Sequence, residues 1–248
     1  MDMIRLDAGC GALAFSTLRG NRGGDDVYAA FNVCHYTGDD AEHVARCRGE
    51  LAAVAGVDAD RLVIPRQTHS VNVAVVGDVM PDVENVDALV TRRSDVALVV
   101  NTADCLPIVL SDGAGGVVGV AHGGWRGLYG GIIEATVSAM KGCGAETERI
   151  IAAIGPCICG GCYEVDEEFA DMFAAAFGEE VRIVSSEGGK PHVDLREVAL
   201  RQLERCGIGR EQVFVSELCS RCDERLFSAR RLGVRSGRIA TVVKRVLI

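Results

Sequence analysis

The chain has 248 residues, of which 48% are apolar, and this is enough to build one large hydrophobic core or two small ones. The formal net charge is −9, opposite in sign to that of a typical nonspecific nucleic-acid binder. No apolar stretch reaches the length of a membrane span, and the first residues lack the basic and apolar regions of a signal peptide. We therefore expect a cytoplasmic protein without nucleic-acid or membrane partners, either monomeric or dimeric.

The first half of the chain predicts mainly short strands. Residues 13–17 are expected to form a strand, and residues 19–26 a polar loop. Residues 41–54 are expected to form a helix, because apolar side chains recur there at helical spacing after two aspartates. Six further strands are expected at 61–65, 71–76, 87–91, 96–102, 106–111 and 117–121. The Asp-Gly-Ala-Gly-Gly segment at 112–116 predicts a hairpin turn between the last two.

The second half predicts three helices, at 127–140, 166–177 and 195–206, each with an apolar stripe. Asp194 is the expected N-cap of the third helix. Strands are expected at 150–154, 213–215 and 239–243. No repeat or Pro-rich linker divides the chain, so residues 1–248 are expected to form one domain. Central strands with scattered helices favour an α+β layered sandwich around a mixed sheet.

Three side chains stand out as candidates for chemistry: His69, Cys105 and His122. The first lies in a polar loop between two apolar runs, and the other two lie at the ends of apolar strands. Neighbouring strands that end side by side would place Cys105 and His122 on one rim. Two imidazoles and one thiolate are a common ligand set for a catalytic zinc ion with an open fourth position.

Each of these residues also has a simpler interpretation. Cys105 would then be a buried core thiol, His122 part of a strand-to-helix turn, and His69 a solvated loop residue.

The same residues without metal would suit a hydrolase with Cys105 as nucleophile and His122 as base. Gly123 and Gly124 would let backbone N–H groups approach an anionic ligand.

The eleven cysteines suggest reduced thiols in the cytoplasm, since no compact disulfide framework is evident. Five of them are expected to be small core residues: Cys10, Cys34, Cys47, Cys143 and Cys206. Five of the remaining cysteines lie in two short segments of the sequence. The segments Cys157-x-Cys159-x-x-Cys162 and Cys219-x-x-Cys222 resemble metal-binding knuckles. A structural zinc site built from four of these thiols is a rival to the His/Cys/His site.

Six motifs together carry a specific resemblance. They are Gln-Thr-His at 67–69, Asp-Ala-Leu-Val-Thr at 87–91, Thr-Ala-Asp-Cys-Leu-Pro at 102–107, Ala-His-Gly-Gly-Trp-Arg-Gly at 121–127, Ile-Gly-Pro at 154–156 and Cys-Tyr-Glu-Val at 162–165. In these the chain resembles the YfiH family, also called the laccase-domain or multicopper polyphenol oxidase-like family and now described as purine nucleoside phosphorylases. The resemblance runs from about residue 31 to residue 239. It departs at residues 226–231, where Ala229 replaces the family's usual Tyr.

The resemblance implies a fold similar to that of the cytotoxic necrotising factor deamidases. It also implies that His69, Cys105 and His122 bind zinc at the active site. The implied reactions are phosphorolysis of adenosine, inosine, guanosine and methylthioadenosine, and deamination of adenosine. Arg48 would contact phosphate.

Arginines and one amide complete the expected substrate site. Arg48, Arg126, Arg231 and Arg238 are candidates for phosphate binding, because a planar guanidinium can clamp phosphate with two hydrogen bonds. Each could equally be a solvated surface residue. Of these we favour Arg48 and Arg126, together with Gln67, as the substrate-binding residues.

The leading hypothesis is thus a zinc-dependent purine nucleoside phosphorylase with adenosine deaminase activity. Phenol oxidation with copper is disfavoured, because a multicopper oxidase needs many more histidines than the five present. A cytoplasmic hydrolase that edits peptidoglycan precursors, or a non-enzymatic interaction module, stays open.

Overall fold

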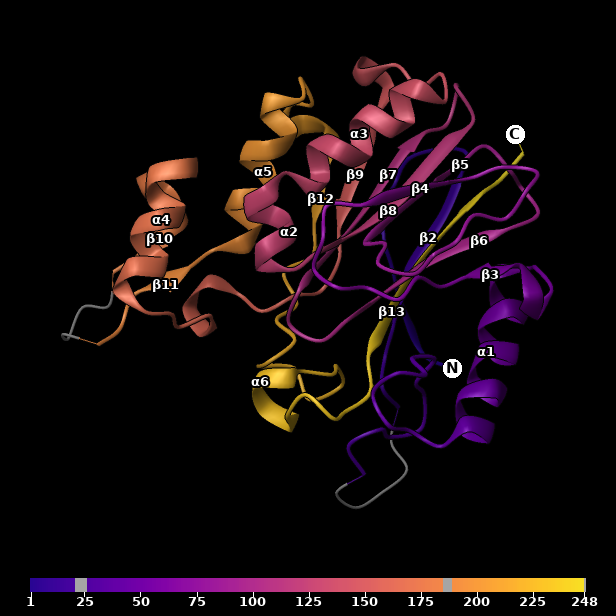
Figure 1. Ribbon diagram of the computed structural model, residues 1–248, viewed down its shortest axis with the longest axis horizontal. Coiled ribbons are helices and arrows are strands. Elements are labelled where there is room, and N and C mark those ends of the chain that lie inside the picture. Colours follow the sequence, from indigo (N-terminus) through magenta and orange to yellow (C-terminus); the bar gives the residue numbers. More distant parts are fainter. Residues whose placement is uncertain (21–25, 185–188, 248) are drawn as a thin grey trace.

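Two mixed β-sheets pack face to face at the centre of the computed structural model, which describes residues 1–20, 26–184 and 189–247 (Figure 1). The five-stranded sheet has the order β1 (Met3–Arg5), β2 (Ala12–Thr17), β13 (Ile239–Arg245), β6 (Ala97–Thr102) and β3 (Leu62–Val63). The six-stranded sheet has the order β12 (Val213–Val215), β9 (Ile151–Ile154), β7 (Leu106–Asp112), β8 (Val117–Gly123), β5 (Ala88–Thr91) and β4 (Val73–Val76). A separate ribbon pairs β10 (Arg182–Ile183) with β11 (His192–Val193).

The two sheets share one apolar layer. Leu98 and Val100 of β6 contribute from one sheet, and Val109 of β7 and Val120 of β8 contribute from the other, all fully buried. Ala97 and Val99 point to the opposite face of β6, because successive side chains alternate along a strand. This strand is therefore buried on both faces, as its run of four apolar residues indicates.

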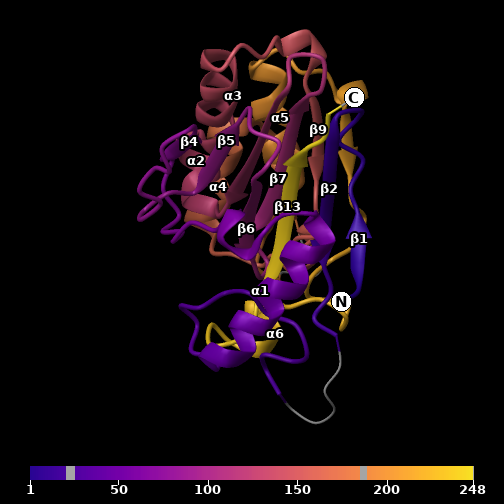
Figure 2. The same ribbon diagram turned by 90° about the vertical axis from the view of Figure 1, so that its right-hand side faces the viewer.

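Helices cover the two outer faces, as Figures 1 and 2 show. α1 (Ala41–Ala55) packs on the five-stranded sheet through Cys47, Leu51 and Ala55. The opposite side carries α2 (Trp125–Gly130), α3 (Ile132–Gly142), α4 (Glu167–Phe177) and α5 (Leu195–Arg205). α6 (Ala229–Leu232) is a single turn near the end of the chain. Short 3₁₀ turns lie at Ala59–Arg61, Thr147–Arg149, Gly160–Cys162, Glu179–Val181 and Arg210–Gln212.

The predicted α+β layered sandwich is confirmed, with two sheets where the sequence suggested one. Most predicted elements are present within one or two residues, and Asp194 caps α5 by accepting a hydrogen bond from the Arg196 backbone N–H (2.9 Å). The single helix expected at 127–140 is wrong. Gly131 has a φ of 89°, a left-handed conformation that ends α2 and lets α3 begin in a new direction.

Several smaller features were not foreseen, including β1, the β10–β11 ribbon and α6. The polar loop expected at 19–26 lies mostly outside the described residues. Among the described residues, none of the helices is long and apolar enough to cross a membrane.

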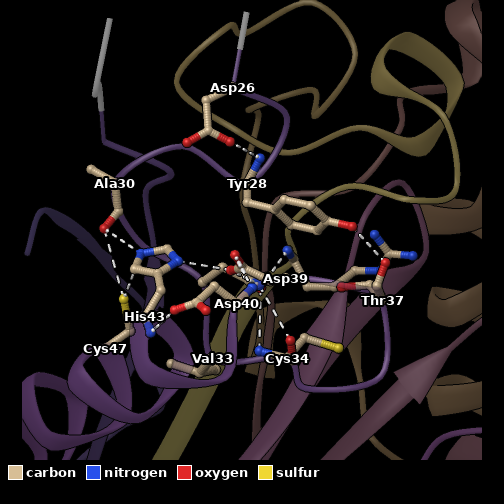
Figure 3. Close-up of polar contacts among 12 residues, drawn as sticks. Asp26, Tyr28, Ala30, Val33, Cys34, Thr37, Asp39, Asp40, His43 and Cys47 are labelled. Atoms are coloured by element: carbon tan, nitrogen blue, oxygen red, sulfur yellow. Dashed lines mark hydrogen bonds and ion pairs between the residues drawn. The ribbon is translucent and has the colours of Figure 1, made fainter.

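A buried polar cluster fixes the start of α1 (Figure 3). Asp40 accepts a hydrogen bond from the His43 backbone N–H (2.8 Å), and the Asp39 carboxylate lies 2.8 Å from His43 Nδ1. His43 Nε2 lies 3.2 Å from the carbonyl oxygen of Ala30, and the Cys47 sulfur lies 3.2 Å from the same nitrogen. These contacts tie the segment before the helix to its first turns, which precede Arg48.

Candidate metal centre and active site

His69, Cys105 and His122 lie together at one end of the six-stranded sheet. Their potential ligand atoms all lie within 4.8 Å of one another, and we call this group the His/Cys/His cluster. The Cys105 sulfur is 3.6 Å from His69 Nε2, and the two imidazole centroids are 4.7 Å apart.

The sheet register explains part of this arrangement. β7 and β8 are antiparallel, with Pro107 opposite His122 and Leu106 opposite Gly123. Cys105 directly precedes β7, so the hairpin that was predicted from its turn brings Cys105 and His122 to the same rim. The convergence expected from the sequence is therefore present.

Asp87 holds the loop of His69 in place. The backbone N–H groups of Thr68, His69 and Ser70 all donate to its carboxylate, at 3.1, 3.0 and 2.7 Å, and the Ser70 hydroxyl donates at 2.7 Å. His69 has a φ of 64°, a conformation that is uncommon for a residue other than glycine. The hydrogen bonds to Asp87 compensate for that strained backbone and orient the imidazole toward Cys105.

Asp87 also orients His122. Its Oδ1 lies 2.7 Å from His122 Nδ1, and both side chains are almost completely buried. A carboxylate can only accept, so Nδ1 carries a proton and Nε2 is left to face the cluster. Burial opposes ionisation of Asp87, but the hydrogen bonds from His122 and Ser70 outweigh it and hold the pKa of this carboxyl well below its usual range.

The sequence motif contained Asp87 but gave it no role. The available signal was a carboxylate at the head of the apolar strand Ala88–Thr91, where all four residues are buried. Nothing in the sequence said that this carboxylate would contact both Ser70, in the loop 17 residues before it, and His122, on the strand 35 residues after it.

Cys105 and His122 shift each other's protonation. Burial opposes the thiolate, but the adjacent His122 charge and hydrogen bonds from His122 and His69 outweigh it and lower the pKa of Cys105 to about 6. Burial likewise opposes the imidazolium, while the Cys105 thiolate and the Asp87 carboxylate raise the pKa of His122 to about 9. Near neutral pH the pair is thus a thiolate beside an imidazolium when no metal is bound.

The two glycines after His122 make room for the cluster. A Cβ on Gly124 would overlap His69 Cδ2 and lie 3.0 Å from His69 Nε2. A Cβ on Gly123 would lie 2.8 Å from the carbonyl oxygen of Leu106. The glycines therefore serve close packing against the loop of His69 and strand β7, a use that the sequence did not suggest.

The predicted substrate residues have different surroundings. Gln67 is engaged with Asn101, donating from Nε2 to its carbonyl oxygen (2.8 Å) and accepting from its N–H (2.7 Å), so it fastens the loop of His69 to β6. Arg126 is exposed on α2 and its guanidinium lies 4.2 Å from the centroid of the Trp125 ring.

Arg48 lies on α1, the helix that packs on the five-stranded sheet. Its Nε donates to the carbonyl oxygen of Val33 (3.0 Å), and its Nη2 lies 2.8 Å from His35 Nδ1. Among the described residues, no contact joins Arg48 to the His/Cys/His cluster.

Two other arginine candidates have structural contacts. The Arg231 guanidinium donates to the carbonyl oxygens of Ser220 and Asp223, at 3.0 and 3.3 Å. The Arg238 guanidinium donates to those of Ser236 and Val234, at 2.7 and 2.9 Å. Their hydrogen-bonding capacity is largely used within the protein.

Tyr163 and Arg230 border the cluster, although the sequence did not single them out. The Arg230 guanidinium lies 5.6 Å from the centroid of the Tyr163 ring, and its backbone N–H donates to Asp104 (2.7 Å). Burial and the neighbouring Cys105 charge raise the pKa of Tyr163 to about 12, so its hydroxyl is a hydrogen-bond donor at neutral pH.

The donor set fits a zinc ion. Zinc–sulfur and zinc–nitrogen bonds of about 2.3 and 2.0 Å imply ligand atoms about 3.3–3.8 Å apart in a tetrahedron. The ligand atoms of the cluster all lie within 4.8 Å of one another, which allows such a site after small side-chain adjustments. The Asp87–His122 contact is the carboxylate–histidine support that metal-bound imidazoles ordinarily have.

Comparison with known proteins places the chain in a family. A family model described as multi-copper polyphenol oxidoreductase laccase matches residues 13–246. The chain belongs to this family. The match and the structural likeness below confirm the YfiH resemblance noted from the six motifs.

Two relatives of this laccase-family protein are named as enzymes. It is 44% identical over 247 residues to "Adenosine deaminase RL5" from an unknown prokaryotic organism, covering 95% of this chain and 94% of the relative. It is 36% identical over 238 residues to "Purine nucleoside phosphorylase" from Bacteroides thetaiotaomicron, covering 91% and 88%. The relatives therefore support an enzyme.

Solved structures agree with the fold. The crystal structure of Bacillus licheniformis hypothetical protein YfiH aligns with a TM-score of 0.90 at 26% identity, covering 98% of this chain and 96% of that one. YlmD from Geobacillus stearothermophilus aligns with a TM-score of 0.88 at 29% identity, covering 100% and 98%.

Proposed function

We propose that this protein is a zinc-dependent enzyme that phosphorolyses adenosine, inosine, guanosine and methylthioadenosine and also deaminates adenosine. The observation that carries the proposal is the convergence of His69, Cys105 and His122, supported by Asp87. The names of the relatives supply the substrate class.

His69, Cys105 and His122 would hold the metal, with Asp87 keeping His122 in the tautomer that coordinates. A zinc ion supplies Lewis-acid chemistry and lowers the pKa of a water molecule. Arg126 would offer its exposed guanidinium to the phosphate, which such a planar group can bind with two hydrogen bonds. Arg48 would do so from α1, and Gln67 would position the loop of His69 against β6.

The test is a nucleoside assay on the purified protein. With inosine and phosphate it should release hypoxanthine, and His69→Ala should abolish the release. His192→Ala is the matched control, because His192 lies on β11 in the separate ribbon and should leave the rate unchanged. Full activity in His69→Ala would contradict the proposal.

A second candidate rests on a specific observation. Cys105, His122 and Asp87 form a thiolate–imidazolium–carboxylate series, the arrangement of a cysteine hydrolase. Such an enzyme could remove a misincorporated amino acid from a cytoplasmic peptidoglycan precursor. Hydrolysis that persists after metal removal and stops on alkylation of Cys105 would favour this function. Activity that disappears when the metal is removed favours the zinc enzyme.

Copper chemistry on phenols is suggested by the family description, and thiolate and imidazole do bind copper. The three histidines outside the cluster have other neighbours: His43 contacts Asp39, His35 contacts Arg48, and His192 pairs with Ile183 across the ribbon. We therefore propose zinc, and metal analysis of the purified protein tests it.

The thiols also bear on location. All eleven cysteines are free in the structure, as expected for a reducing compartment. We propose a cytoplasmic location on this ground, to be tested by fractionation of the source cells.

A further inference from the structure

A second group of potential metal ligands lies outside the His/Cys/His cluster. The adjacent strands β9 and β12 are parallel, with Ala152 opposite Val213 and Ile154 opposite Val215 (Figure 1). The segments that follow them therefore leave the sheet at the same end. They stay paired beyond the sheet. The backbones of Cys157 and Cys219 form an isolated parallel β-bridge, and the Ser220 N–H donates to the Cys157 carbonyl oxygen (3.0 Å).

These two segments bring together two Cys-x-x-Cys pairs. The sulfurs of Cys159, Cys162, Cys219 and Cys222 all lie within 4.8 Å of one another, and we call them the thiol cluster. The sulfurs of Cys162 and Cys222 are 3.4 Å apart, far beyond the disulfide length of about 2.05 Å. In a tetrahedral zinc–thiolate site the sulfurs are about 3.8 Å apart, so small shifts would suffice to admit a metal ion.

Backbone donors point at the cluster as well. The Cys159 N–H donates to the Cys219 sulfur at 3.3 Å, and the backbone N–H groups of Arg221 and Cys222 also face that sulfur. Donors in this position stabilise the negative charge that a thiolate must carry to bind a metal.

We propose that Cys159, Cys162, Cys219 and Cys222 bind a structural zinc ion, separate from the ion of the His/Cys/His cluster. Cys157, the fifth thiol of the two segments, does not belong to it. Its sulfur accepts a hydrogen bond from Arg196 Nε (3.4 Å), and its side chain is fully buried in the core under α5. Four ligands in two knuckles close the coordination shell, which is typical of a structural and not a catalytic site.

The structural ion would also brace the candidate active site. The Ser220 hydroxyl donates to Asp104 (2.7 Å), and the Ile158 N–H donates to the Asp104 carbonyl oxygen (3.0 Å). Asp104 has a φ of 84° and directly precedes Cys105. Crosslinking the two segments through a metal thus fixes the residues that hold Asp104 in this unusual conformation.

Metal content of the full chain tests the proposal. The wild type, purified with its native metal, should contain two zinc ions per chain, and Cys222→Ser and Cys162→Ser should each lose one. Cys143→Ser and Cys206→Ser are matched controls outside both clusters and should retain two. His122→Ala should also lose one ion, but a different one, which separates this proposal from the proposed function.

Cobalt absorption identifies the type of ligand directly, because each thiolate bound to the metal adds charge-transfer intensity. After exchange of zinc for cobalt, the wild type and His122→Ala should both show strong thiolate-to-cobalt charge-transfer absorption and tetrahedral d–d bands. Cys222→Ser should lose most of this absorption. The proposal is overturned if His122→Ala binds no metal, if Cys222→Ser retains both ions, or if peptide mapping finds a Cys162–Cys222 disulfide in the native protein.

Discussion

At the scale of single residues, Asp87 connects the parts of the candidate site. One buried carboxylate accepts three backbone N–H groups from the loop of His69 and the Nδ1 proton of His122. It therefore sets the position of one imidazole and the tautomer of the other. Neither the position of His69 nor the tautomer of His122 could be inferred from the three candidate ligands without Asp87.

Asp87→Asn should weaken zinc binding at the His/Cys/His cluster. Loss of a carboxylate that supports a metal-bound histidine typically lowers affinity about 10- to 100-fold. Chelator competition, with Cys222→Ser as the background to isolate one site, measures the change.

Asp112→Asn is the matched control for this variant. Asp112 is also a buried aspartate of the six-stranded sheet, but it pairs with Arg149 (2.9 Å) at the far end of β7, about 20 Å away by strand length. It should lower stability and leave zinc affinity unchanged. Equal losses of affinity in both variants would show that Asp87 acts only through stability.

The pKa of Cys105 gives a second prediction. Alkylation requires the thiolate, so in metal-free protein the rate at Cys105 should reach half its maximum near pH 6 and fall below that pH. An ordinary thiol would show this near pH 8.5. Cys206, whose pKa burial raises to about 11, should stay slow throughout, and bound zinc should protect Cys105. Mass spectrometry of the labelled peptides separates the two rates, and a midpoint at or above pH 8 contradicts the prediction.

At the scale of elements, the sequence predicted the features that depend on neighbouring residues, such as a turn and its hairpin. The turn at 112–116 fixed the β7–β8 hairpin, and that hairpin brought Cys105 and His122 together. His69 was proposed as the third ligand from its residue type, but no local pattern predicted its position, because the hydrogen bonds that direct it come from Asp87. The break at Gly131 was missed since the apolar stripe continues across it, and the stripe carries no sign of the left-handed conformation that ends α2 there.

The turn from β8 into α2 should not tolerate a side chain at Gly124. In Gly124→Ala the new Cβ would displace His69, so the His/Cys/His cluster should lose its zinc while the thiol cluster keeps its ion. Gly142→Ala is the control, because a Cβ there meets nothing within 4 Å. Metal analysis should find one ion in the first variant and two in the second, and two ions in both would contradict the packing described for His69.

At the scale of the whole molecule, the division into two sheets depends on contacts between distant segments. β13, at the end of the chain, lies between β2 and β6, and no local pattern indicates those neighbours. The sequence therefore predicted strands and a layered α+β class but not the partition of the strands. The layer that contains Leu98, Val109 and Val120 then makes each sheet part of the other's core.

This shared layer predicts that the two sheets unfold together as one domain. Leu98 is fully buried between them, and Leu98→Ala should cost about 2–5 kcal/mol. Trp125, the only tryptophan, lies on the helix-covered side of the six-stranded sheet, so its fluorescence reports on the sheet that does not contain Leu98. In zinc-loaded protein, fluorescence and far-UV circular dichroism should give one coincident transition, and both should shift equally in Leu98→Ala.

Val54→Ala, on the exposed face of α1, is the control and should change stability by no more than about 0.5 kcal/mol. A Trp125 transition that stays in place while circular dichroism shifts would mean that the sheets unfold separately.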